Sequence, residues 1–260
     1  MKIIFKIILF THFVYPFVSS DVSGKNGVVV SSKIQASDIG INIMKNGGNA
    51  IDAAIGVCFA LAVTHPSAGN IGGGGFMVIK FADGKSTAID FRETAPILST
   101  ENMFQDENGE VIQGMSTSSS LSVGVPGTVA GMGYVYEKYA TLPWKDLVYP
   151  SFLLAKYGFE LDLHNHYLFN NPSLINKLNQ DKVSRKVFVE NKSYNLKDNI
   201  IQAELAETLL RIANYGYKEF YFGQTADNII SCMNRKNGII SYNDLASYRV
   251  NELNPIEFKY

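Results

Sequence analysis

Arg92 is the residue of this 260-residue chain whose type and position best suit a role in chemistry. It follows the short, mainly apolar run Ala-Ile-Asp-Phe at 88–91 and precedes Glu-Thr-Ala-Pro at 93–96. A guanidinium at the end of a strand can bind a carboxylate through two parallel hydrogen bonds. The residues alone also allow an ordinary surface pair with Asp90 or Glu93, so both interpretations stay open at this point.

Four successive glycines at 72–75 lie before Arg92 in the chain. They do not form a phosphate-binding loop, because no Lys-Ser or Lys-Thr follows them and a dinucleotide fingerprint would need glycine where Met77 stands. They also precede a strand, whereas nucleotide fingerprints follow one. Glycines let the backbone come close to another segment or to a ligand, and the spacing favours the structural role over the binding role.

The remaining candidate nucleophiles and metal ligands are weaker. His164 and His166 are two residues apart, so on a helix they do not share a face, and no third ligand accompanies them. His65 at a helix end is expected to be structural, and Cys58 on an apolar helix is a poor nucleophile. No Gly-x-Ser-x-Gly elbow is present. These residues therefore predict neither a metal site nor a cofactor.

Composition limits the class of protein. With 46% hydrophobic and 18% charged residues, the chain can form one globular domain with a substantial core. A net charge of −1 gives no reason to expect nucleic acid or an anionic membrane surface as a partner. Two cysteines exclude a disulfide-dense scaffold. A Cys58–Cys232 bridge is conceivable, but the apolar run around Cys58 favours a buried free thiol.

The first twenty residues differ from the rest. Two early lysines are followed by an almost wholly apolar run at 7–18 and by small residues ending at Ser20. This pattern predicts a secretory signal peptide cleaved after Ser20. A membrane anchor is the alternative, which Pro16 and the shortness of the apolar run disfavour. We expect residues 21–260 to form a periplasmic or secreted protein without a membrane span.

The elements around Arg92 can be predicted from periodicity and turn signals. Residues 50–63 form an apolar stretch rich in small residues, predicted to be a helix capped by Asn49 and buried on all sides. Asp83-Gly84 predicts a hairpin between strands at 76–81 and 86–91, with Arg92 at the end of the second strand.

The other elements complete a layered α+β fold. We expect a helix capped by Ser37 or Asp38 and ended by the glycines at 47–48. The remaining expectations are a buried strand at 27–31, a loop at 116–122, helices from about Pro126, at 144–157 and at 204–214, and a strand at 250–260.

Several blocks of the sequence carry a resemblance to a known family when taken together. The blocks are NAIDAA at 49–54, HPSAGNIGGGGF at 65–76, DFRETAP at 90–96 and GVPGTVAG at 124–131, continued by Gly-Ile-Ile at 238–240 and DLASY at 244–248. Any one of them alone would be a weak signal, but their shared order is specific, and together they resemble the γ-glutamyltransferase (glutathione hydrolase) family. The resemblance extends from about residue 27 to the end of the chain, more loosely after residue 161.

The resemblance implies an αββα sandwich of the N-terminal-nucleophile hydrolase type. Family members are precursors that cleave themselves into a large and a small subunit. The new N-terminal threonine of the small subunit attacks the γ-glutamyl amide of glutathione or a similar compound. Backbone donors stabilise the oxyanion, and the acyl group passes to water or an amino acid. In this family the arginine of the Arg-Glu-x-Ala-Pro motif holds the substrate α-carboxylate, a role that the resemblance assigns to Arg92.

The sequence departs from the family pattern in one respect. The family's threonine lies in a Thr-Thr-His-x-Ser-like context, whereas the Thr-His pairs here are Thr11-His12 and Thr64-His65, and neither fits the nucleophile. We therefore expect no catalytic residue in this chain, which would be inactive without the missing small subunit. The sandwich would be incomplete, with apolar faces such as that of residues 50–63 exposed.

Two alternatives keep parts of this interpretation. One is an enzyme of the same fold with another substrate, such as a cephalosporin acylase or a poly-γ-glutamate enzyme. The other is a non-catalytic remnant that still binds an amino acid through Arg92.

Overall fold

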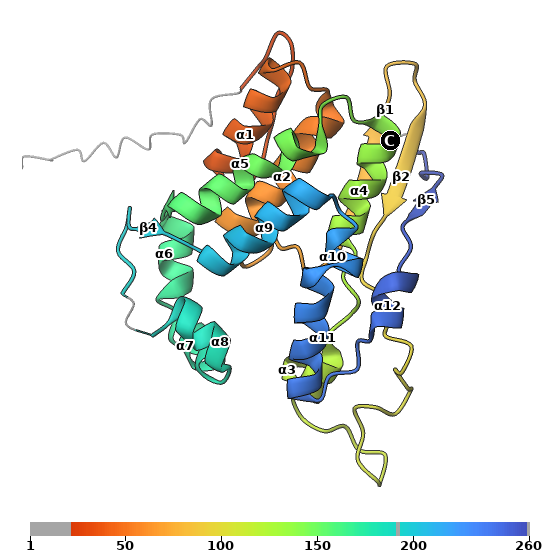
Figure 1. Cartoon of the computed structure of the whole chain (residues 1–260), viewed down its shortest axis with the longest axis vertical. Helices are drawn as coiled ribbons and strands as arrows, with labels where there is room; N and C mark the ends of the chain where they lie inside the picture. Colours follow the sequence, from red (N-terminus) through yellow and green to blue (C-terminus); the bar gives the residue numbers. More distant parts are fainter. Residues whose placement is uncertain (1–21, 191–192, 259–260) are drawn as a thin grey trace, which may run out of the picture.

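The computed structural model describes residues 22–190 and 193–258, which form a mixed α+β structure (Figure 1). The proposed signal peptide lies outside these residues. The strands are β1 Phe76–Lys80, β2 Ser86–Asp90, β3 Phe159–Glu160, β4 Asn199–Ile200 and β5 Asn251–Leu253. The helices are α1 Ile34–Lys45, α2 Ala50–Thr64, α3 Met115–Ser118, η1 Ser120–Ser122 (3₁₀), α4 Thr128–Tyr139, α5 Trp144–Tyr157, α6 Leu163–Phe169, α7 Pro172–Asn179, α8 Lys182–Phe188, α9 Ala203–Tyr215, α10 Glu219–Phe222, α11 Gln224–Lys236 and α12 Tyr242–Ser247. None of the described helices is long and apolar enough to cross a membrane.

The larger sheet has the strand order β1-β2-β5 and is antiparallel throughout. β1 and β2 form the predicted hairpin, in which Phe76 pairs with Asp90 and Lys80 with Ser86. Gly84 takes the left-handed conformation in the turn, with φ of 88°, which glycine adopts without strain. Because β2 ends at Asp90 and the last backbone bonds to the neighbouring strand are those of Phe91, Arg92 lies just past the end of the central strand, as predicted.

The helices pack beside this sheet. In Figure 1, α4 stands next to the strands, and α1, α2, α5 and α9 lie beyond it. α2 packs against α1, α4 and α5, and its Ile55, Phe59 and Val63 are fully buried. At Gly56 a side chain would collide with Ile43 of α1, so this glycine lets the two helices approach closely. The core therefore runs from the sheet through α4 to the helices beyond.

α2 begins as predicted and is covered more fully than predicted. Asn49 caps it by accepting hydrogen bonds from the N–H groups of Ile51 and Asp52, and Asp52 completes the capping box. The expectation of an exposed apolar face on this helix is wrong, because every residue from Ile51 to Thr64 is buried or half-buried. Exposed apolar side chains lie on β1 instead, at Phe76 and Val78.

Two predicted strands are corrected by the structure. Residues 27–31 are irregular and mostly exposed, with Val30 87% exposed, because none of the described strands pairs with them. A β-branched run becomes a strand only where a neighbour satisfies its backbone. At the other end, only Asn251–Leu253 of the predicted strand at 250–260 pairs with β2, and Pro255 then lacks the N–H that a ladder needs. Residues 259–260 lie outside the described part.

Smaller corrections concern the limits of several helices and one predicted loop. α1 begins at Ile34, before the predicted caps Ser37 and Asp38, and the side chain of its N-cap residue Lys33 makes no capping hydrogen bond. The predicted loop at 116–122 contains the short helices α3 and η1. α4 begins at Thr128, two residues after Pro126, with Gly127 as N-cap. α5 matches its predicted limits and α9 extends one residue further at each end.

Candidate functional site

Arg92 lines a small hollow at the end of β2. The side chain is exposed and its guanidinium lies over the Phe76 ring, 5.5 Å from the centroid. Among the described residues it forms no ion pair, so the surface pair with Asp90 or Glu93 is not made. The hollow has a volume of about 210 Å³. Its lining consists of Asp90, Arg92, Glu93, Thr94, Tyr248, Arg249 and Asn251.

The glycine segment packs directly against the backbone around Arg92. A side chain on Gly74 would lie 2.7 Å from the Arg92 Cα atom and 2.8 Å from the Glu93 nitrogen. The Gly73 carbonyl accepts hydrogen bonds from the N–H groups of Gly127 (2.7 Å) and Thr128 (2.9 Å) at the start of α4. This contact confirms that the glycines allow a close backbone approach, which the sequence favoured over a ligand-binding role.

The loop after Arg92 is tied to two other segments. Thr94 and Val125 exchange backbone hydrogen bonds of 3.3 and 2.8 Å. Further along, the Ile97 N–H donates to the Asp244 carboxylate at 2.6 Å. Burial opposes ionisation of Asp244, but hydrogen bonds from Ser241 and from the Ile97 N–H outweigh it and lower the pKa of that carboxyl. A charged Asp244 therefore fixes this loop to the start of α12.

Tyr248 makes the contact that sequence reasoning missed. Its hydroxyl donates a hydrogen bond of 2.8 Å to the Arg92 carbonyl, and its ring is buried. Burial raises the pKa of Tyr248 to about 12, and the charges of Asp90 and Glu93 add to the effect. The only signal in the sequence was its place in the block at 244–248, which gave it no role. The phenol is therefore a neutral donor at any ordinary pH.

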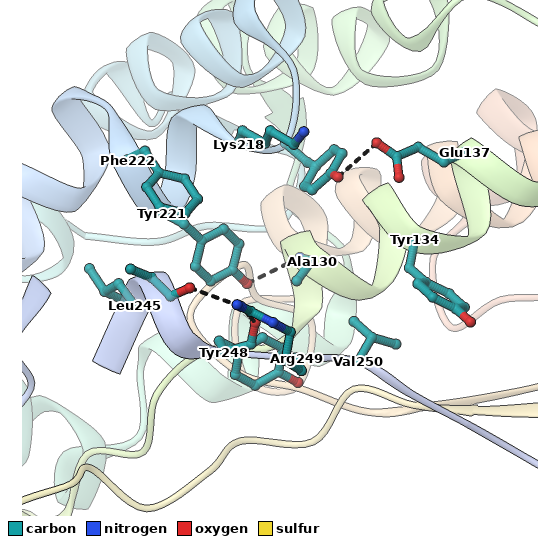
Figure 2. Close-up of a pocket in the computed structure, with 12 residues that line it drawn as sticks. Ala130, Tyr134, Glu137, Lys218, Tyr221, Phe222, Leu245, Tyr248, Arg249 and Val250 are labelled. Carbon is teal, nitrogen blue, oxygen red and sulfur yellow. Dashed lines mark hydrogen bonds between the residues drawn. The ribbon is translucent and has the colours of Figure 1, made fainter. Parts of the chain in front are cut away.

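A second cavity of about 340 Å³ lies beside this hollow and shares Tyr248 and Arg249 with it (Figure 2). Five of its twelve lining residues are aromatic, and the walls come from α4, from α10 with the two residues before it, and from the segment around α12. Arg249 is held there by the carbonyls of Ala246 and Tyr248, at 2.8 and 2.7 Å. Tyr248 and Arg249 therefore contribute to the walls of both the hollow and the cavity.

The histidines do not assemble a centre. The rings of His65 and His164 are 5.3 Å apart, and burial, followed by the charges of Lys33 and His164, lowers the pKa of His65. His166 instead lies 3.0 Å from the Tyr194 carbonyl through its Nδ1 atom. Within the described residues no three potential ligands form a group that could hold a metal ion.

Cys58 and Cys232 are both free, in agreement with the predicted free thiol. Burial raises the pKa of the Cys58 thiol to about 12, so it stays protonated and unreactive.

The fold and the Arg92 motif define a member of a known enzyme family. Residues 36–260 match the model of the gamma-glutamyltranspeptidase family, and the chain belongs to that family. It is 43% identical over 242 residues to a glutathione hydrolase proenzyme of Pseudomonas sp. (strain A14) and 42% identical over 242 residues to that of Escherichia coli (strain K12). Each alignment covers 92% of this chain but only 42% and 41% of the relative, so the chain spans less than half the length of these proteins.

A solved structure supports the same conclusion. The chain matches Helicobacter pylori gamma-glutamyltranspeptidase with a TM-score of 0.89 and 41% identity, covering 92% of this chain and 69% of that one. The α+β fold of the N-terminal-nucleophile hydrolase type, expected from the resemblance, is thereby confirmed.

Proposed function

We propose that this chain carries the part of a γ-glutamyltransferase (glutathione hydrolase) that binds the γ-glutamyl group, with Arg92 as the ligand of its α-carboxylate. The observation that carries the proposal is that Arg92 lines a hollow of about 210 Å³ at the end of β2, while its guanidinium forms no ion pair among the described residues. A planar guanidinium suits a carboxylate because two of its N–H groups can donate in parallel.

Glutathione is the substrate that the relatives support. Both curated relatives named above are glutathione hydrolase proenzymes. These names do not favour the alternatives of an acylase, a poly-γ-glutamate enzyme or a non-catalytic remnant. The word proenzyme also agrees with a precursor that is cleaved into two subunits, of which this chain would belong to the large one.

The chain contributes binding and orientation rather than the attacking group. Arg92 would fix one end of the γ-glutamyl group, which holds the scissile amide at a set distance from the guanidinium. We place the nucleophilic threonine on the small subunit, the partner that this chain would need for turnover. The complete gene product is therefore the protein in which activity should be measured.

The test compares two substrates in the complete gene product. Arg92→Ala should raise KM for L-γ-glutamyl-p-nitroanilide roughly 10- to 100-fold, because it removes hydrogen bonds to a charged group. It should leave kcat/KM unchanged for 4-aminobutyryl-p-nitroanilide, which lacks only the α-carboxylate. Arg235→Ala, at an exposed arginine of α11, is the matched control. An equal loss for both substrates would refute the assignment of Arg92.

We also propose that the protein is exported, because its first twenty residues have the composition of a signal peptide. Mass spectrometry of the purified protein should find Asp21 at its N-terminus. A purified protein that still carries residues 1–20 would contradict export by this route.

A further inference from the structure

We propose that Tyr248 is a positioning residue that sets the direction of Arg92 toward the γ-glutamyl carboxylate. The inference rests on the role proposed for Arg92 and extends it to a residue 156 positions further along the chain. Tyr248 itself does not touch the substrate in this scheme. It acts through the backbone of the arginine.

The backbone of Arg92 depends on side chains because the sheet no longer holds it. β2 ends at Asp90, and the last ladder bonds are those between Phe91 and Gly75. The Arg92 N–H instead donates to the Asp90 carboxylate at 3.0 Å, and the Arg92 carbonyl accepts from the Tyr248 hydroxyl at 2.8 Å. Two side chains thus fix the peptide groups on either side of the Cα atom that carries the guanidinium.

Tyr248 is itself held in one orientation. Its ring stacks on Tyr221, with the centroids 6.0 Å apart and the planes 15° from parallel. The Tyr221 hydroxyl donates to the Pro126 carbonyl at 2.8 Å and accepts from the Ala130 N–H at 3.1 Å, which fixes that ring to the start of α4. Figure 2 shows these rings between α4 and the segment that leads to β5.

Gly127 leaves the space that the hydroxyl occupies. A side chain at this position would collide with both the Tyr248 hydroxyl and the Phe91 carbonyl. Gly127 therefore leaves room for the Tyr248 hydroxyl to reach the Arg92 carbonyl, although the three residues belong to different sequence blocks. Packing alone would need only the ring of Tyr248, whereas the hydroxyl is needed only for the bond to Arg92.

Removing the hydroxyl should affect substrate binding selectively. Without its hydrogen bond the Arg92 carbonyl is freer to move, and ordering the arginine on binding becomes more costly. The chemistry on the partner subunit is untouched. In the complete gene product, Tyr248→Phe should therefore raise KM for L-γ-glutamyl-p-nitroanilide roughly threefold to tenfold and leave kcat nearly unchanged.

The matched control is Tyr242→Phe, which removes the hydroxyl that donates to Asp227 on the exposed surface. The second readout is 4-aminobutyryl-p-nitroanilide, whose kcat/KM should not respond to Tyr248→Phe because it has no α-carboxylate. In the double variant with Arg92→Ala, the phenylalanine should add no further loss, since both changes act on one interaction.

The outcomes separate the two proposals. If Arg92→Ala discriminates between the substrates but Tyr248→Phe does not, or if the two losses add in full, the positioning role is refuted while the role of Arg92 stands. If Arg92→Ala itself does not discriminate, the proposed function fails first. Should Tyr248→Phe not fold, Tyr221→Phe removes the hydrogen bonds that hold the ring stacked on Tyr248, and it must give a selective rise in KM of the same kind for the proposal to hold.

Discussion

At the scale of single residues, the site depends on the absence of side chains at particular positions. Gly74 faces the backbone of three successive residues around Arg92, with the Phe91 carbonyl oxygen 2.5 Å and the Arg92 Cα atom 2.7 Å from where its Cβ atom would lie. Backbone cannot turn aside as a flexible side chain can. Gly72, two positions earlier, has open space around it. The two positions therefore differ: the structure leaves no room for a side chain at Gly74 but leaves room for one at Gly72.

This difference gives a prediction within one motif. Gly74→Ala should destabilise the protein by about 1–3 kcal/mol, because overpacking forces the glycine segment away from Arg92. Gly72→Ala should change the free energy of unfolding by less than about 0.5 kcal/mol, as expected for an unobstructed surface position. Urea denaturation of both variants measures the difference. Equal losses would mean that the segment tolerates a methyl group at either place.

At the scale of elements, the start of α2 is joined to the rest of the fold through one buried carboxylate. The buried Asp52 carboxylate accepts from the Asn49 N–H at 2.8 Å, which closes the capping box. It also accepts from the Thr141 N–H and hydroxyl, at 3.0 and 2.6 Å, and from the Leu142 N–H at 3.2 Å. One side chain thus joins α2 to the connection between α4 and α5.

Asp52→Ala should therefore cost more than the loss of an ordinary cap. A cap is worth about 1 kcal/mol, and each buried donor left without a partner adds about 1–3 kcal/mol, so we expect a loss of about 3 kcal/mol or more. Asp38→Ala, at an exposed position of α1, is the control and should be nearly neutral. A loss of less than about 1 kcal/mol at Asp52 would show that water replaces the carboxylate.

The elements also show which parts of the fold could be predicted from the sequence. α2, α5 and the β1–β2 hairpin were predicted correctly because local signals define them: caps, a long periodic pattern and an Asp-Gly turn. Residues 27–31 and 254–258 were wrongly predicted to be strands. A strand also needs a neighbouring strand to pair with, and no described strand pairs with either segment. Local preference cannot supply that information.

At the scale of the whole molecule, the sequence likewise identifies those parts of the site that lie in a local motif and misses those that depend on distant contacts. Arg92 could be identified because it lies in a short motif, Arg-Glu-Thr-Ala-Pro, that resembles a known family. Tyr248 could not be given a role, since its contact with Arg92 spans 156 positions and leaves no local pattern. Four of the blocks that carried the resemblance, at 65–76, 90–96, 124–131 and 244–248, meet in space around Phe91 and Arg92, through Gly74, Gly127 and Tyr248.

Glu252 of β5 joins the sheet that presents this site to α4. Its carboxylate accepts from the Thr87 hydroxyl (2.8 Å), from the hydroxyls of Tyr134 (2.7 Å) and Tyr139 (2.8 Å), and from the Lys138 ammonium. The bond from Lys138, followed by those from the hydroxyls, lowers the pKa of Glu252 from 4.5 to about 2. A carboxyl with a lowered pKa in the folded state stabilises that state only while it is ionised.

The contribution of Glu252 to the stability of the folded state should decrease at acid pH. Above about pH 4.5 Glu252 is charged in both states and its full contribution is present, and the contribution is lost as the pH falls toward about 2. Glu252→Gln should thus lower the thermal midpoint near neutral pH, and the gap to the wild type should narrow as the solution is acidified. Glu257→Gln, an exposed glutamate in the same segment, should show no such convergence. A gap at Glu252 that stays constant from about pH 7 to about pH 3 would mean that the carboxylate charge does not hold β5 in place.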